Sequence, residues 1–184
     1  MNAPIWLITG DRGAGKTTLC RMLIDAAHRA GWRVGGLLSP PVLEGRERVA
    51  IDVEDLRKGE RRRLASLAQP GTPGEVHTCR WAFDAATLAW GDQALRQALP
   101  CDLLVIDELG PLEFERGQGW TSAFAALEHA GAYRMALVVV RPELLAAARR
   151  RWPQAEILTL MAVEQTPSLA ASLEREFFTP TRTP

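Results

Sequence analysis

Cysteine and histidine are scarce in this chain, with three residues of each among 184. The cysteines Cys20, Cys79 and Cys101 form no CxxC pair and no zinc-ligand spacing, and their odd number is typical of reduced thiols in the cytosol. The histidines are just as far apart, so we expect each to be structural or exposed. These two shortages argue against a disulfide framework and against a zinc centre.

An excess of charge and a long apolar segment are also missing. Lys+Arg and Asp+Glu number 22 each, so the formal net charge at pH 7 is zero, which argues against a general polyanion binder. No apolar run reaches the roughly 18 residues that a membrane span needs, and the N-terminus has no secretion-signal pattern. We therefore expect a cytoplasmic protein with no membrane contact and no strong nucleic-acid signal.

What the chain does have is enough apolar sequence for one globular core, with a hydrophobic fraction of 47%. Residues 5–9 form a short apolar run, typical of a buried strand in a parallel sheet. Residues 17–30 have apolar side chains at helical spacing, and 33–38 form a second apolar run. This order predicts a βαβ unit with a right-handed crossover.

The same patterns extend the prediction to the rest of the chain. Further buried strands are predicted at 102–107, 134–140 and 155–160, and helices at 84–99, 118–131, 142–151 and 168–177. Ser39 to Pro41 should end the strand at 33–38. A β-hairpin insertion is predicted after it, from apolar and charged residues that alternate at 48–54, a returning strand at 63–67, a loop at 69–74 and a further strand at 77–83.

Together these elements predict an α/β fold of the P-loop NTPase type, a mostly parallel sheet flanked by helices, with the β-hairpin insertion at about residues 45–83. We expect residues 1–178 to form a single domain and residues 179–184 a loose tail.

The fold type follows from the sequence GDRGAGKT at residues 10–17, between the first strand and the first helix. It matches the phosphate-binding loop GxxxxGK[ST], and the flanking strand and helix are the context that separates this loop from a chance glycine-rich turn. Its backbone N–H groups are expected to point at a phosphate, at the positive end of the helix dipole. The predicted nucleotide-binding residues are Gly10, Asp11, Arg12, Gly13, Ala14, Gly15, Lys16, Thr17 and Thr18.

Individual side chains of this loop suit defined roles. Lys16 is a compact charge that can reach the β- and γ-phosphates, and the only other lysine in the chain is Lys58. Thr17 offers a hydroxyl for Mg²⁺. Thr18 is expected near the α-phosphate.

A second acidic motif follows a later strand. In LLVIDE, residues 103–108, four apolar residues precede Asp107 and Glu108. Asp107 is predicted to bind Mg²⁺ through water together with Thr17, and Glu108 to polarise a water for in-line attack. The alternative is that Asp107 only ends the strand and Glu108 is solvated, and the upstream loop favours the catalytic role. Glu113 is either a further acid of the site or a helix-start carboxylate.

Several arginines are candidates for contact with the transferred phosphate. They are Arg12, Arg116 and Arg141, and Arg141 is favoured because it follows the carboxyl end of a strand, where ligands bind in open α/β sheets. The basic run at 57–63 is a weaker candidate for binding phosphate or RNA. Its turn-like sequence favours a solvated hairpin tip.

The order of these motifs resembles the small P-loop nucleoside-triphosphatase family, which has thermophilic-type and cancer-related members. The likeness rests on GDRGAGKTTL, GGLLSPPV, ERVAIDVEDLRKGERRRLA and VIDELGPLEF, and it extends to about Val140. It implies Mg²⁺-dependent hydrolysis of several nucleoside triphosphates, with residues 10–17 on the nucleotide and Asp107 and Glu108 on magnesium and water. The chain departs from the family at Pro111-Leu112, where Lys-Met is common, and near the C-terminus, where the family's Asn-Arg pair is missing.

The leading prediction is therefore a Mg²⁺-dependent nucleoside-triphosphatase acting on ATP/GTP-type nucleotides, with Lys16, Asp107 and Glu108 as catalytic residues. A nucleotide or small-molecule kinase has the same loop but must exclude water and bind an acceptor. A nucleotide-gated accessory ATPase that acts on a protein partner is the third hypothesis. A standard GTPase is not favoured, because the only asparagine, Asn2, lies outside any Asn-Lys-x-Asp base clamp.

Overall fold

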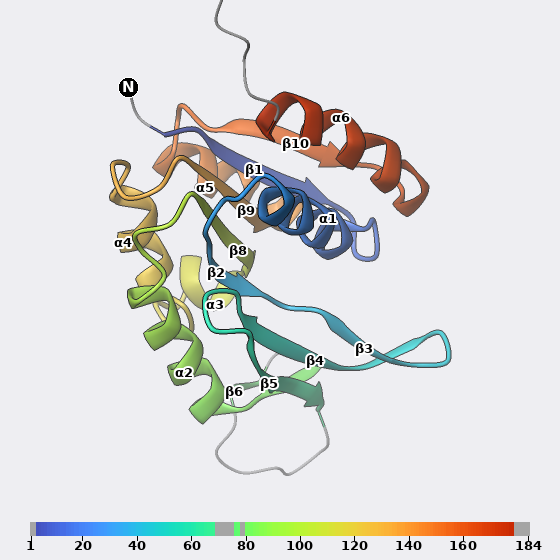
Figure 1. Ribbon diagram of the computed structural model, residues 1–184. Coiled ribbons are helices and arrows are strands. Elements are labelled where there is room, and N and C mark those ends of the chain that lie inside the picture. The colour runs from blue at the N-terminus through green and yellow to red at the C-terminus, as the bar shows by residue number, and fades with distance from the viewer. Residues whose placement is uncertain (1–2, 69–75, 78–79, 179–184) are drawn as a thin grey trace, which may run out of the picture.

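The computed structural model describes residues 3–68, 76–77 and 80–178 of the chain. Within these residues ten strands form one mixed sheet, and helices cover both of its faces (Figure 1). The predicted α/β architecture is confirmed. The expected loop at 69–74 and the expected tail at 179–184 lie outside the described residues.

One half of the sheet is parallel, with the strand order β10-β1-β9-β8-β2. These strands are β1 (Ile5–Gly10), β2 (Val34–Leu38), β8 (Leu103–Leu109), β9 (Met135–Val140) and β10 (Glu156–Leu160). β2, β8 and β9 are buried almost throughout, as continuous apolar runs predict for strands covered on both faces. Every parallel strand expected from the sequence is present.

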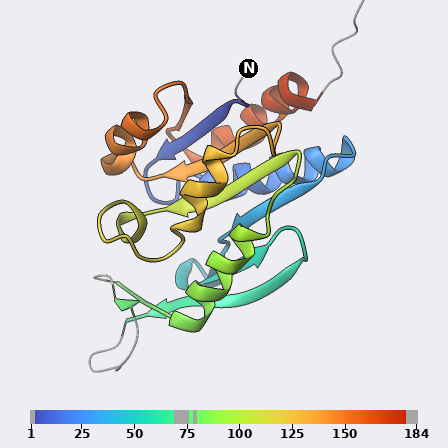
Figure 2. The same ribbon diagram turned by 90° about the vertical axis from the view of Figure 1, so that its left-hand side faces the viewer.

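Helices pack on the two faces according to their apolar residues. On one face, α1 (Lys16–Arg29) and α6 (Thr166–Phe178) share a core cluster with alternate residues of the central strands, such as Ile8 and Val105. On the other, α2 (Ala85–Arg96), α4 (Ser122–Glu128) and α5 (Leu145–Arg151) cover the cluster that contains Leu7 and Leu104. Figure 2 looks onto this second face, with α2 and α4 in front of the strands.

The other half of the sheet is antiparallel. It contains β3 (Pro41–Glu44), β4 (Glu47–Asp55), β5 (Glu60–Leu67), β6 (Val76–His77) and β7 (Trp81–Phe83). The order continues from β2 through β4, β5 and β7 to β6, and β3 pairs with β4. The predicted hairpin insertion is thus present, but it begins earlier than residue 45. As predicted, β2 ends at Leu38, before Ser39 and the prolines, and Pro41 is the first residue of the next strand, a position that proline tolerates.

The predicted helix at 118–131 is shorter than expected. It is α4, which begins only at Ser122, because Gly117 and Gly119 have φ angles of 60° and 70°, a conformation that a right-handed helix does not contain. A short helix that was not predicted, α3 (Pro111–Phe114), precedes this break. Two 3₁₀ turns, Pro142–Leu144 and Val163–Gln165, lead into α5 and α6. The predicted N-cap of α2 is correct, since Asp84 accepts a hydrogen bond from the Thr87 N–H at 2.6 Å.

The strand register places β3 and the beginning of β4 beyond the ends of the parallel strands. β2 pairs with β4 only through Leu37 and Leu38, whose partners are Asp55 and Glu54. The beginning of β4 pairs with β3 instead, with Arg48 opposite Leu43. The β3–β4 ribbon therefore extends past the carboxyl end of β2, on the side of the sheet where β1 leads into the loop before α1 (Figure 1).

Candidate active site

The loop between β1 and α1 has the backbone geometry that its glycines allow. Gly10, Gly13 and Gly15 have φ angles of 141°, 85° and 95°, in the region that other residues rarely adopt. A Cβ atom on Gly10 would lie 2.2 Å from the carbonyl oxygen of Leu160 in β10. Gly15 is the N-cap of α1, and its carbonyl accepts the Leu19 N–H at 2.8 Å. The chain thus forms a curled loop at a helix N-terminus, which is a geometry that binds anions.

Lys16 lies across this loop. Its Nζ donates hydrogen bonds to the carbonyl oxygens of Gly10 at 2.6 Å and Asp11 at 2.8 Å. The side chain is half-buried, and among the described residues no carboxylate forms an ion pair with its ammonium.

Asp107 lies near the end of β8 and is 2% exposed. Its Oδ2 accepts the Ser39 N–H at 3.2 Å, and it also interacts with the Thr17 hydroxyl. The pKa of Asp107 is raised to about 7, mainly by burial and in part by the charge of Glu108, against the hydrogen bonds from Ser39 and Thr17, which lower it. The structure thus brings together the two residues that the sequence predicted as magnesium ligands.

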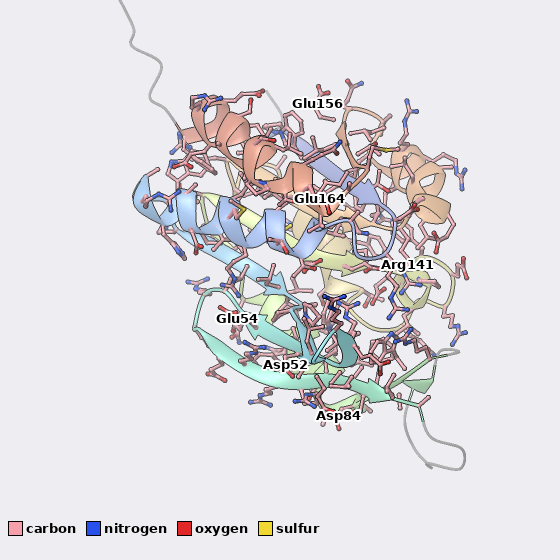
Figure 3. The ribbon with its side chains drawn as sticks, turned by 90° about the vertical axis from the view of Figure 1, so that its right-hand side faces the viewer. Asp52, Glu54, Asp84, Arg141, Glu156 and Glu164 are labelled. Carbon is pink, nitrogen blue, oxygen red and sulfur yellow. The ribbon has the colours of Figure 1, made fainter. Side chains whose placement is uncertain are left out.

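Glu108 follows Asp107 on β8 and pairs with Arg141 at the end of β9. The Arg141 Nε donates a hydrogen bond to Oε1 of Glu108. Figure 3 shows Arg141 on the side of the molecule that carries the loop before α1. Burial lowers the pKa of Arg141, but the charge of Glu108 and the bond to it raise that pKa more. Arg141 was favoured as a phosphate contact, and in this arrangement it holds a carboxylate.

Three further arginines surround one indole ring next to this pair. The guanidinium carbons of Arg12, Arg48 and Arg80 lie 5.7, 6.0 and 5.5 Å from the centroid of the Trp81 ring, within the range of cation–π contact. Arg12 was a candidate from the sequence, but Arg48, Arg80 and Trp81 were not. They come from the antiparallel half, and no local pattern signals that these strands reach the phosphate loop.

The carboxylate of Glu113 is bound by backbone N–H groups of its own segment. Glu113 is 7% exposed, its Oε2 accepts the Gly110 N–H at 2.8 Å, and its Oε1 accepts the Trp120 N–H at 3.0 Å. Burial raises its pKa, and these bonds oppose that shift. Of the two interpretations of Glu113, the hydrogen bonds support the helix-start carboxylate, since it caps the first turn of α3. Arg116 follows α3 and is exposed.

The basic run 57–63 is engaged away from the loop. Arg57 donates to the carbonyl oxygen of Leu99 at 3.1 Å, and Arg61 and Arg63 bind opposite oxygens of Asp52 at 2.9 and 2.6 Å. Residues 56–59 form the β4–β5 turn, as the hairpin-tip interpretation predicted. That turn packs near the segment that enters β8, at the amino end of the parallel strands.

The site combines a glycine-rich phosphate loop, its lysine and hydroxyl, and an Asp-Glu pair at the end of a nearby parallel strand. This combination defines the class of P-loop NTPase folds. A family model described as NTPase matches residues 6–152, and the chain belongs to this family. The family predicted from the order of motifs is thereby confirmed.

Curated relatives include two proteins named nucleoside-triphosphatase THEP1. That of Pyrococcus abyssi is 35% identical over 115 residues, which are 61% of this chain and 62% of the relative. That of Ignicoccus hospitalis is 37% identical over 109 residues, 59% of this chain and 60% of the relative. The chain therefore matches about three fifths of the length of these relatives.

Two solved structures have the same fold. A human cancer-related nucleoside triphosphatase superposes with a TM-score of 0.69 at 22% identity, over 93% of this chain and 97% of that one. THEP1 from Aquifex aeolicus superposes with a TM-score of 0.62 at 18% identity, over 92% and 96% of the two chains. Among the described residues, no helix has the length and apolarity to cross a membrane.

Proposed function

We propose that this chain is a Mg²⁺-dependent nucleoside-triphosphatase that hydrolyses ATP/GTP-type nucleotides to the diphosphate and phosphate. The observation that carries the proposal is the meeting of Thr17 and Asp107 beside the Lys16 loop, with Glu108 next in sequence. The names of the curated relatives support the same activity.

The loop binds the triphosphate through its backbone and Lys16. The N–H groups at the start of α1 donate to the β-phosphate, where the helix dipole also favours negative charge. Lys16 gives up its two carbonyl acceptors, Gly10 and Asp11, for β- and γ-phosphate oxygens, which are stronger acceptors because they are charged. Thr18 is exposed at the start of α1, where it can reach the α-phosphate.

The donor set around Asp107 fits magnesium. The Thr17 hydroxyl and the Asp107 carboxylate are hard oxygen ligands next to one another, and the buried Ser39 Oγ beside them has no hydrogen-bond partner among the described residues. Ser39 is thus free to hold a metal-bound water. Mg²⁺ keeps several waters and is usually bound by only one or two carboxylates together with phosphate oxygens, so this small donor set is sufficient. When bound, Mg²⁺ neutralises charge on the phosphate oxygens.

Glu108 is the general base. Its carboxylate lies at the end of β8, one residue beyond Asp107, and is partly exposed. It accepts a proton from a water as that water attacks the γ-phosphorus in line with the leaving oxygen. Arg141 fixes the orientation of this carboxylate through the Nε–Oε1 bond, so that its other oxygen is available to the water.

The arrangement supports hydrolysis over transfer to an acceptor. A kinase needs a lid whose cations close over the transferred phosphate. The basic run 57–63, which could supply such cations, binds Asp52 and the segment around Leu99 instead. Glu108 is partly open to solvent, which suits water as the acceptor.

Phosphate release from ATP, GTP and CTP tests this proposal. We expect Mg²⁺-dependent release by the wild-type protein and by Lys58→Ala, a control that removes the other lysine from the β4–β5 turn, and none by Lys16→Ala. Equal release by the wild type and Lys16→Ala would contradict the proposal. Labelled phosphate on an added nucleoside or monophosphate, in place of free phosphate, would show a kinase.

A further inference from the structure

The β3–β4 ribbon carries positive charge to the phosphate loop. β4 leaves β2 at the Leu38–Glu54 pair and continues beyond it, so that Arg48 lies past the carboxyl end of the parallel strands. Trp81, at the start of β7, pairs with Leu67 at the far end of β5 and therefore lies on the same side. Arg12 reaches this indole ring from the loop itself. Two regions distant in sequence thus meet around Trp81.

The arginines around Trp81 have acids within electrostatic reach but none in direct contact among the described residues. The set of Arg12, Arg48 and Arg80 forms no ion pair among the described residues. The Nε of Arg48 is buried and has no hydrogen-bond partner in that part of the chain. Burial and the charge of Arg12 lower the pKa of Arg48, while Glu108 and Asp107 raise it, so the guanidinium lies within electrostatic reach of the acidic pair. A buried N–H donor without an acceptor is costly.

A triphosphate supplies the acceptors that this cluster lacks. Arg141 is already bound to Glu108, and Lys16 lies over the loop. Of the arginines around Trp81, Arg12 belongs to the loop and Arg48 is within electrostatic reach of the acidic pair, so these two are placed for the remaining phosphate oxygens. The negative charge on the phosphate oxygens redistributes in the transition state. A guanidinium that is already positioned beside these oxygens stabilises that transition state.

We propose that Arg48 contacts the γ-phosphate, with Arg12 beside it, and that Trp81 positions both side chains. The antiparallel half of the sheet then supplies in the same chain the arginine that other phosphate-loop enzymes take from a partner protein. This inference rests on the proposed function, since it assigns a role at the same site. No partner protein is then needed to supply an arginine to the site.

Substitution of Arg48 tests the proposal, with Arg46→Ala as the matched control. Arg46 lies in the same ribbon, is exposed, and loses the same charge on substitution. We expect Arg48→Ala to lower kcat by about 10²- to 10³-fold, as the loss of one transition-state donor does, while Arg46→Ala stays within about twofold of the wild type, the range of an ordinary surface change. Guanidinium ion at low millimolar concentration should partly restore Arg48→Ala and leave Arg46→Ala unchanged.

Binding without turnover separates this inference from the proposed function. We expect Arg48→Ala to weaken a non-hydrolysable triphosphate at least tenfold more than the diphosphate, because only the triphosphate has the contacted group. Equal weakening of both ligands, or an unchanged kcat, would overturn the role of Arg48. Absence of hydrolysis by the wild type, with the affinity difference intact, would overturn only the proposed function. Should Arg48→Ala fail to fold, Arg48→Gln keeps much of the side chain without its charge and carries the same comparison.

Discussion

The Nε of Arg141 donates a hydrogen bond to Oε1 of Glu108, and this bond joins the ends of two adjacent parallel strands. Both residues follow apolar strand segments that are almost completely buried. The Glu108 carboxylate is therefore positioned both by the backbone of β8 and by Arg141 from the neighbouring strand. Asp107, one residue earlier, lies against Thr17 of the loop, so the two adjacent acids have separate partners.

The first prediction concerns the Arg141–Glu108 bond. We expect Arg141→Ala to lower kcat by about 10- to 100-fold, because a misplaced catalytic group has a cost of this size, with little change in KM. In a double-mutant cycle, Arg141→Ala should add almost nothing to Glu108→Gln, since its effect acts through that carboxylate. Additive losses would instead indicate that Arg141 contacts the phosphate directly.

The second prediction compares two glycines of the same loop. Gly10→Ala places a Cβ atom 2.2 Å from the Leu160 carbonyl oxygen, whereas Gly13→Ala meets nothing within 4 Å. Both need a positive φ, which costs about 1–3 kcal/mol for another residue. The clash in Gly10→Ala adds to that, so its free energy of unfolding in urea should fall by about 2 kcal/mol more than that of Gly13→Ala. Equal losses would show that the loop does not approach β10 this closely.

The third prediction tests whether Glu113 is structural. Glu113→Ala should lower the free energy of unfolding by about 1.5–3 kcal/mol, the cost of charged hydrogen bonds to two backbone N–H groups, while kcat and KM of the folded protein stay close to the wild type. Glu115→Ala, an exposed neighbour, serves as the control. A large loss of kcat with unchanged stability would place Glu113 in the catalytic machinery.

The pKa of Glu113 adds a pH dependence to this third prediction. Burial raises that pKa in the folded chain, so the folded state binds the proton more tightly than the unfolded state. The contribution of Glu113 to stability is therefore largest below the ordinary glutamate pKa and declines as the pH rises toward the raised value. Glu113→Gln should remove this decline in urea titrations across the acidic range, and an unchanged profile would contradict it.

The parallel core and the Lys16 loop were predictable because their signals are local. The apolar runs of β1, β8 and β9 are long enough to identify buried strands, and GDRGAGKT lies between a strand and a helix. The break at Gly119 was missed because a glycine inside a helical pattern does not reveal its φ angle. Arg48 and Trp81 were missed for a different reason. They approach the loop only because β4 overhangs β2, and that register depends on strand pairing between distant segments.

The most direct test is a comparison of the wild type with Glu108→Gln for both binding and turnover. We expect the two proteins to bind Mg²⁺–nucleoside triphosphate with similar affinity, because Lys16 and the loop are unchanged. Phosphate release by Glu108→Gln should fall by about 10²- to 10⁴-fold, the usual contribution of a general base, while Glu115→Gln releases phosphate at the wild-type rate. Undiminished release by Glu108→Gln would contradict hydrolysis at this site.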